Sequence, residues 1–177
     1  MRRSALLVDD FVTVEEREHV IDWYHEHSDK VGKFKNTTTT YRMIGDSNKD
    51  VCPVEEATPI VRNIWDRLDT FARNEYSCEL QWAQVYKWPP GSFMDMHHDV
   101  ASRVTTLTSV LWLNEDFMGG ELQFRDGTTF VPVSGRAIWY DGIKNHHRVR
   151  KVNRGTRWAI AAWYKDIECN TNSMKKT

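Results

Sequence analysis

The stretch 79-ELQWAQVYKWPPG-91 marks the point at which the chain changes from helical to strand patterning. From Glu79 onward the sequence follows a period of two, which places successive side chains on opposite faces of a strand. Pro89-Pro90-Gly91 then ends the segment with residues typical of turns. Short glycine-containing turns separate further segments of this kind. These segments are 105–113, 120–124, 129–131, 136–140, 147–152 and 157–164. The second half of the chain is therefore predicted to be a series of short strands.

Two helices are predicted before this series. The run 13-TVEE-16 has the form of a capping box, in which the threonine hydroxyl and a glutamate carboxylate bind free amides at a helix start, and predicts a helix over about 14–27. Thr58 as cap and Pro59 at the first helical position open a second helix, with the apolar stripe Ile60, Val61, Ile64, Trp65, Leu68, Phe71 and Ala72. Short strands are expected at 5–8 and 38–43. Two helices packed on many strands predict a mainly β fold with flanking helices and a double-stranded β-helix (jelly-roll) core.

Length and composition predict one domain over 1–177, with a helical N-terminal support over 1–75 and a jelly-roll core over about 79–166. The 24 basic and 25 acidic side chains give a net charge of -1, so no basic field favours nucleic acid as a partner. Three cysteines without C-x-x-C spacing fit a reducing compartment. The apolar run at 5–8 is too short for a secretory core or a membrane span. We therefore expect a cytoplasmic protein without membrane contact.

Two histidines and an aspartate stand together in 93-FMDMHHDVASR-103. In an extended strand alternate side chains share a face, so His97 and Asp99 point the same way while His98 points to the opposite face. An imidazole nitrogen and a carboxylate oxygen suit a divalent first-row metal. One further histidine from another strand would complete a facial triad of two histidines and one carboxylate.

A second histidine pair, His146 and His147, is the candidate source of the third ligand. Only one of the two can face inward on a strand, and alternation with Val149 favours His147. Ten residues further on, Arg157 opens an otherwise apolar strand. Such an arginine is either a charge at the rim or a buried anchor that binds a dicarboxylic ligand through two hydrogen bonds.

Together these residues resemble the iron(II)- and 2-oxoglutarate-dependent dioxygenases, and within them the prolyl hydroxylases. Four segments in the same order carry the resemblance: 6-LLVDDFVTVEEREHVIDW-23, 86-YKWPPGSFMDMHHD-99, 110-VLWLNEDFMGGELQF-124 and 145-NHHRVRKVNRGTRWAIAAWYKD-166. The second contains the approach to His-x-Asp, and the third contains a Leu-Asn turn and Gly-Gly-Glu-Leu. The fourth contains Asn-x-His-x-Val, Gly-x-Arg and a Trp-Tyr end. The resemblance covers most of the chain.

Carried over residue by residue, the resemblance implies that His97, Asp99 and His147 bind iron(II). It selects the second histidine of the downstream pair because the family has the order asparagine, variable residue, ligand histidine. It also implies that Arg157 pairs with the distal carboxylate of 2-oxoglutarate.

The resemblance also concerns four aromatic residues. Tyr86 is similar to the tyrosine that helps to hold 2-oxoglutarate, although it lies eleven residues before His97, at least one more than usual, and Trp88 stands where other members have tyrosine. Trp112 stands where prolyl hydroxylases of the oxygen-sensing type have another cosubstrate-binding tyrosine, and an indole can donate only one hydrogen bond. Trp163 matches a tryptophan that lines the active site of the family.

The resemblance implies a hydroxylase that uses iron(II), 2-oxoglutarate and oxygen, with ascorbate as reductant, and that releases succinate and carbon dioxide. The expected substrate is a prolyl residue in a protein or peptide. One alternative is the same chemistry on another amino acid side chain or on a nucleic acid base, although the balanced charge does not favour nucleic acid. Another is a cupin-like metal-binding barrel without oxygenase activity, which would not need Arg157. The sequence gives no indication of the oligomeric state.

Overall fold

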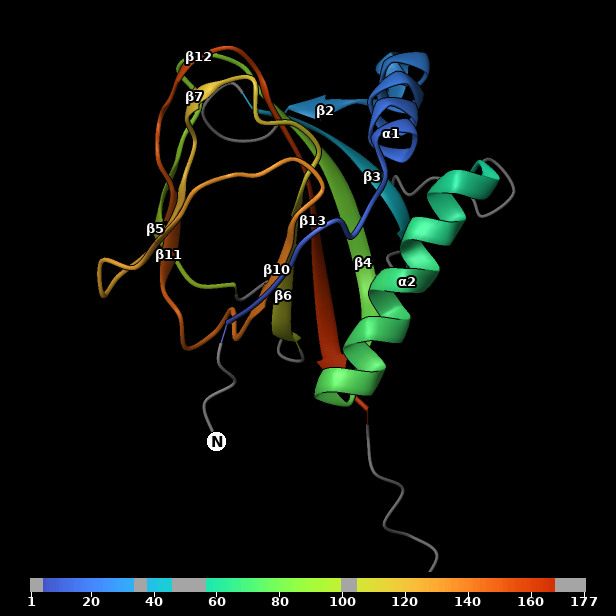
Figure 1. The fold of residues 1–177 in the computed structure, drawn as a ribbon, viewed down its shortest axis with the longest axis vertical. Helices are drawn as coiled ribbons and strands as arrows, with labels where there is room; N and C mark the ends of the chain where they lie inside the picture. Colours follow the sequence, from blue (N-terminus) through green and yellow to red (C-terminus); the bar gives the residue numbers. More distant parts are fainter. Residues whose placement is uncertain (1–4, 34–37, 46–56, 100–104, 168–177) are drawn as a thin grey trace, which may run out of the picture.

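The computed structural model describes residues 5–33, 38–45, 57–99 and 105–167. Two α-helices lie on one side of a β structure in this part of the chain (Figure 1): α1 (Val14–Glu26) and α2 (Pro59–Tyr76). A single 3-10 turn, η1 (Ser28–Lys30), follows α1. Every pairing between described strands is antiparallel.

The strands form a major and a minor sheet. The major sheet has seven strands in the order β1 (Leu6–Val8), β10 (Ala137–Tyr140), β6 (Thr105–Trp112), β13 (Arg157–Asp166), β4 (Cys78–Trp88), β3 (Thr39–Gly45) and β2 (Gly32–Lys33). The minor sheet has four strands in the order β5 (Met94–His97), β11 (His147–Val149), β8 (Leu122–Phe124) and β9 (Thr129–Phe130). A separate pair joins β12 (Val152–Arg154) to β7 (Met118–Gly119).

The two sheets pack face to face. One buried cluster joins Val110 and Ile138 of the major sheet to Leu122 and Phe124 of the minor sheet. Two antiparallel sheets closed over a shared apolar interior, with helices outside the larger one, are the double-stranded β-helix architecture. The predicted fold class is confirmed.

Both predicted helix starts are present. At α1 the Thr13 hydroxyl accepts from the Glu16 amide at 3.2 Å, and the Glu16 carboxylate accepts from the Thr13 amide at 2.9 Å, which completes the capping box. At α2 the Thr58 hydroxyl accepts from the amide of Val61 at 3.3 Å, with Pro59 in the first turn. The apolar faces of both helices pack in one cluster with the outer face of the major sheet.

Alternation along β13 divides the interior into two regions. Trp158, Ile160, Ala162 and Tyr164 belong to the cluster under the helices. The alternate residues Arg157, Ala159, Ala161 and Trp163 line a cavity between the sheets. Because one strand contributes to both regions, its period of two separates the helix-packing face from the face that can hold a ligand.

The structure differs from the sequence prediction at several strands. Strands β2 and β7 lie outside the predicted ranges. The predicted strand 147–152 is divided into β11 and β12, because β11 pairs with β5 and β8 whereas β12 pairs with β7. Strand β5 ends at His97, so Asp99 lies beyond the strand rather than within it. Cys78 is buried and forms no disulfide, and the other two cysteines lie outside the described residues.

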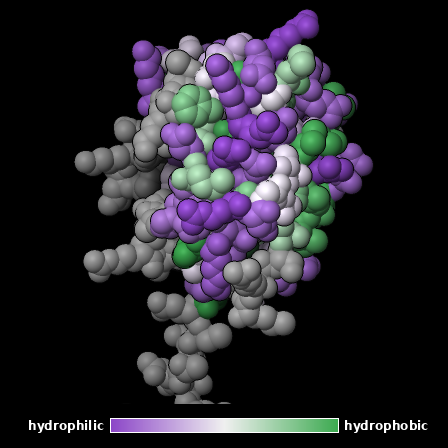
Figure 2. All heavy atoms as spheres, turned by 90° about the vertical axis from the view of Figure 1, so that its left-hand side faces the viewer, coloured by the Kyte–Doolittle hydropathy of each residue, from purple (hydrophilic) through white to green (hydrophobic). Residues whose placement is uncertain are grey.

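The outer side of the minor sheet is mainly hydrophilic. Figure 2 shows this side of the molecule, on which hydrophilic side chains predominate and hydrophobic ones are scattered. Arg148 at the centre of β11 is exposed there, whereas its neighbours His147 and Val149 are buried. Within the described ranges, no helix has the length and apolar character needed to cross a membrane.

Candidate metal and cosubstrate site

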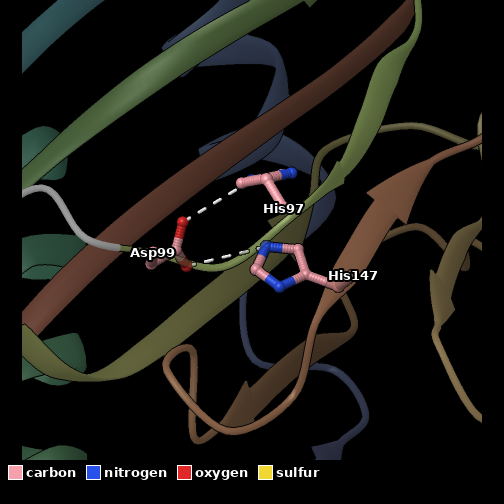
Figure 3. A group of neighbouring side chains, drawn as sticks. All are labelled: His97, Asp99 and His147. Carbon is pink, nitrogen blue, oxygen red and sulfur yellow. Dashed lines mark ion pairs between the residues drawn. The ribbon is translucent and has the colours of Figure 1, made fainter.

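His97, Asp99 and His147 lie together between the sheets. Strands β5 and β11 pair so that His97 is directly opposite His147, although the two residues are fifty positions apart in the chain. The Nε2 atom of His97 lies 3.7 Å from Oδ1 of Asp99, and Nε2 of His147 lies 3.6 Å from Oδ2 (Figure 3). One ligand atom from each residue falls within 4.8 Å of the others. Neighbouring ligand atoms around one first-row metal ion are roughly 3–4 Å apart, so the two distances between histidine and aspartate fit such an ion.

Hydrogen bonds set the tautomer of both imidazoles. Nδ1 of His97 lies 2.8 Å from the carbonyl oxygen of Asp95, and Nδ1 of His147 lies 2.8 Å from that of Asn145. A carbonyl oxygen can only accept, so each Nδ1 carries the proton and donates it. Each Nε2 then presents its lone pair toward Asp99, and this orientation of the second ring nitrogen is typical of metal-binding histidines.

Two neighbours that the sequence analysis did not select hold Asp99 in place. The amide of Asp99 donates to the carbonyl oxygen of Gly142 at 2.9 Å, and the Thr108 hydroxyl donates to Oδ2 at 2.6 Å. A Cβ atom on Gly142 would lie 2.2 Å from the Thr108 hydroxyl oxygen and 2.8 Å from Oδ2 of Asp99. Glycine is therefore required for this close approach. A sequence signal existed for Thr108, since it is a polar residue on the inward-facing period of an apolar strand.

Burial favours the uncharged form of His147. Its exposed fraction is 4%, and this desolvation lowers the pKa of the imidazole, an effect that the nearby Asp99 carboxylate partly opposes. Only a neutral imidazole has the free lone pair that a metal ligand needs.

The other two histidines of these segments lie on the opposite face. The rings of His98 and His146 are 4.9 Å apart, and each residue is next in the chain to one member of the paired residues His97 and His147. Neither joins the group of potential metal ligands among the described residues.

Arg157 lies in the same cavity as the three residues. The cavity contains about 480 Å³ of empty space, including space at its open mouth. Arg157 is 1% exposed and forms no ion pair within the part of the chain that the structure describes. Burial lowers the pKa of its guanidinium to about 10, so it stays charged at neutral pH. A buried cation without a carboxylate is costly, and an anionic ligand would offset that cost.

Two local features position this arginine. Its guanidinium carbon lies 5.2 Å from the centre of the Trp88 ring, in a cation–π arrangement. On the other side, a Cβ atom on Gly120 would lie 2.8 Å from Cδ of Arg157, and Gly120 has a φ of +71°. Gly120 therefore does more than connect two strands, because only glycine leaves this space.

Of the aromatic residues singled out from the sequence, some line the cavity and one does not. Tyr86, Trp88 and Trp163 all line the cavity. Trp112 does not line it and is wholly buried in the apolar cluster between the sheets. Tyr140, which the sequence analysis did not select, is a lining residue. Burial, followed by the charge of the nearby aspartate, raises the pKa of Tyr140, so the phenol keeps its proton.

Residues 82–165 match the family model described as the 2OG-Fe(II) oxygenase superfamily. The match covers most of the strand-rich second half of the chain, which is therefore similar to this superfamily. The superfamily's description implies iron(II), 2-oxoglutarate and oxygen as metal, cosubstrate and oxidant. The residues present fit these groups: two neutral imidazoles with a carboxylate suit iron(II), and a buried guanidinium suits a dicarboxylic acid.

Three known proteins illustrate this similarity. Prolyl 3-hydroxylase 1 of Rattus norvegicus is 41% identical over 64 residues, which are 32% of this chain and 9% of the rat protein. The 2-oxoglutarate and iron-dependent oxygenase domain-containing protein 3 of Xenopus tropicalis is 29% identical over 157 residues, 76% of this chain and 49% of that protein. The chain thus spans less than half of either relative. The viral collagen prolyl hydroxylase of Paramecium Bursaria Chlorella virus-1, solved with 2OG, superposes with a TM-score of 0.71 at 17% identity, covering 94% of this chain and 97% of the viral one.

Proposed function

We propose that this oxygenase hydroxylates prolyl residues of a protein or peptide, with conversion of 2-oxoglutarate and oxygen to succinate and carbon dioxide. The observation that supports this best is Arg157, a buried guanidinium without an ion-pair partner in the described part of the chain, in the same cavity as a His–Asp–His group. A metal-binding barrel of the cupin type has no need of such an arginine.

In this proposal His97, Asp99 and His147 hold iron(II), which when bound supplies the oxidising chemistry on oxygen. Two neutral imidazoles and one carboxylate leave the metal centre with a net positive charge that attracts an anionic cosubstrate. The Thr108 hydroxyl keeps the carboxylate aimed at the metal position, and the two backbone carbonyls keep both imidazoles in the ligating tautomer.

Arg157 binds the distal carboxylate of 2-oxoglutarate in this proposal, and Tyr86 adds a contact to the same cosubstrate from the neighbouring strand β4. Arg157 pairs in register with Trp88, and Ala159 pairs with Tyr86. The small side chains of Ala159 and Ala161 leave room along β13 for a slender diacid between Arg157 and the metal ligands. Ascorbate is expected to keep the metal in its reduced state.

The prolyl substrate is proposed from the relatives' names together with the aromatic lining of the cavity. Trp163 lines the cavity and stacks on Trp82 with ring centres 4.1 Å apart and an angle of 15° between the planes. Flat aromatic faces suit the apolar ring of proline, and the net charge of -1 does not favour a nucleic acid substrate.

Succinate formation tests the reaction. Purified protein with iron(II), ascorbate and 2-oxoglutarate should form succinate, slowly even without substrate. His147→Ala should abolish it and lose bound metal, whereas His146→Ala, on the outer face, should retain both. The oxygenase proposal fails if no succinate appears and if His147→Ala binds as much metal as the unchanged protein.

Mass spectrometry tests the substrate separately. Proline-containing peptides incubated with the active protein should gain the mass of one oxygen atom, and fragmentation should place it on proline. A gain found only on lysine, or only on a free amino acid, would exclude the prolyl substrate while leaving the oxygenase chemistry intact.

A further inference from the structure

Tyr140 is a buried residue whose hydroxyl has no hydrogen-bond partner among the residues that the structure describes. The residue is 1% exposed and lines the cavity, and its hydroxyl makes no hydrogen bond to any residue in the described ranges. Tyr164 provides a direct contrast in the same sheet. It is equally buried, but its hydroxyl lies 2.8 Å from the hydroxyl of Ser109. Buried polar groups almost always have a partner, so the Tyr140 hydroxyl is suited to a ligand in the cavity.

The position of Tyr140 is close to both ends of the proposed cosubstrate site. Its ring centre lies 4.9 Å from that of His147, in an edge-to-face arrangement. Asp99 and Arg157 line the same cavity as Tyr140, so this cavity joins the tyrosine to the candidate metal ligands and to the guanidinium. Its neighbour across the strands is Thr108, which binds Asp99.

Tyr140 provides a hydrogen-bond donor in the cavity lining, whereas Trp112 does not. Trp112 stands where prolyl hydroxylases of the oxygen-sensing type have a cosubstrate-binding tyrosine, but the structure buries this indole in the apolar cluster outside the cavity lining. Trp112 lies on β6 and Tyr140 on the adjacent strand β10. Tyr140 therefore provides a hydrogen-bond donor one strand away from the position of Trp112.

We propose that the Tyr140 hydroxyl is a further cosubstrate-binding group, which donates a hydrogen bond to a carboxylate of bound 2-oxoglutarate. This inference rests on the proposed function, because it takes 2-oxoglutarate as the occupant of the cavity. Arg157 supplies the charge that attracts the diacid, and Tyr140 adds a neutral donor of fixed direction that favours one orientation of the ligand.

The test is a calorimetric titration of 2-oxoglutarate into Mn(II)-loaded protein, in which the ligand binds without turnover. Tyr140→Phe removes one oxygen atom and keeps the ring contact with His147. It should weaken 2-oxoglutarate binding roughly 10- to 100-fold, the range expected for a hydrogen bond to a charged group, with unchanged manganese content. Tyr164→Phe is the matched control and should bind 2-oxoglutarate like the unchanged protein.

Pyruvate, a 2-oxo acid without a distal carboxylate, identifies which carboxylate Tyr140 contacts. A loss of affinity for 2-oxoglutarate alone assigns the hydroxyl to the distal carboxylate, and a loss for both ligands assigns it to the carboxylate next to the oxo group. Equal affinity of Tyr140→Phe and unchanged protein for 2-oxoglutarate overturns the inference. If the unchanged protein itself fails to bind 2-oxoglutarate, the proposed function fails instead.

Discussion

Replacement of Thr108 by valine removes the hydrogen bond that orients the carboxylate of the proposed metal site. The Thr108 hydroxyl donates to Oδ2 of Asp99 at 2.6 Å, and the same oxygen lies 3.6 Å from Nε2 of His147. Valine keeps the β-branched shape of threonine and lacks the hydroxyl, so the substitution removes the donor with little change of shape in β6. Without the donor, rotation of the carboxylate away from the histidines is no longer opposed.

The size of the effect follows from the burial of this pair. Thr108 is 2% exposed and Asp99 is 8% exposed, so water cannot replace the lost donor efficiently. A hydrogen bond to a charged group contributes about 1.5–3 kcal/mol. At about 1.4 kcal/mol per factor of ten, Thr108→Val should weaken the binding of divalent metal by roughly 10- to 100-fold, which is the range measured for groups that support metal ligands.

The assay is a titration of iron(II) without oxygen, or of Mn(II) in air, into metal-free protein. Thr106→Val is the matched control, because the hydroxyl of Thr106 donates to Asp166 at 3.1 Å on an exposed part of the same strand. This control should bind metal like the unchanged protein. Unchanged affinity of Thr108→Val, or an equal loss in Thr106→Val, would refute the reasoning.

Further predictions concern the ligand faces, the buried arginine and the glycine beside the metal site. His97→Ala should lose bound iron whereas His98→Ala, on the opposite face, should keep it; equal metal content in both would contradict the assignment. Arg157→Met should abolish 2-oxoglutarate binding, measured by calorimetry. It should also raise the melting temperature of the metal-free protein, because burial disfavours the charged guanidinium and lowers its pKa to about 10. A lower melting temperature would argue against this reasoning. Gly142→Ala should reduce metal content, because its Cβ would stand 2.2 Å from the threonine hydroxyl. The control Gly32→Ala has open space around its Cβ and should bind normally.

Local patterns in the sequence were sufficient for most elements of the fold. The capping box at Thr13 and the Thr58-Pro59 start give helices that begin where predicted. The period of two locates the strands of the second half except β5 and β7, which lie outside the predicted ranges, and it does not reveal the division of 147–152. That division depends on which distant strands β11 and β12 pair with, and a local pattern does not contain this information.

The roles of the groups around the candidate ligands could not be assigned in this way. Thr108 differs from the apolar residues on its face of the strand only by being polar, Tyr140 is an ordinary member of an apolar strand in the sequence, and Gly142 has the pattern of a turn. Their importance comes from contacts across strands that are far apart in the chain. The burial of Trp112 also depends on such long-range contacts. Alternation places this residue on an inward face of its strand, but the closed barrel buries it in the apolar cluster outside the cavity lining.

The sequence by itself determined which side chains share a face. Alternation separates His97 from His98 and predicts that Arg157 and Trp163 lie on one face of a strand, because the geometry of a single strand decides this. Only the tertiary structure decided that His97 lies opposite His147 and that Arg157 shares their cavity without an acidic partner in the described ranges. Those facts depend on the register between strands fifty residues apart and on closure of two sheets over one interior, and long-range packing rather than local patterning determines both.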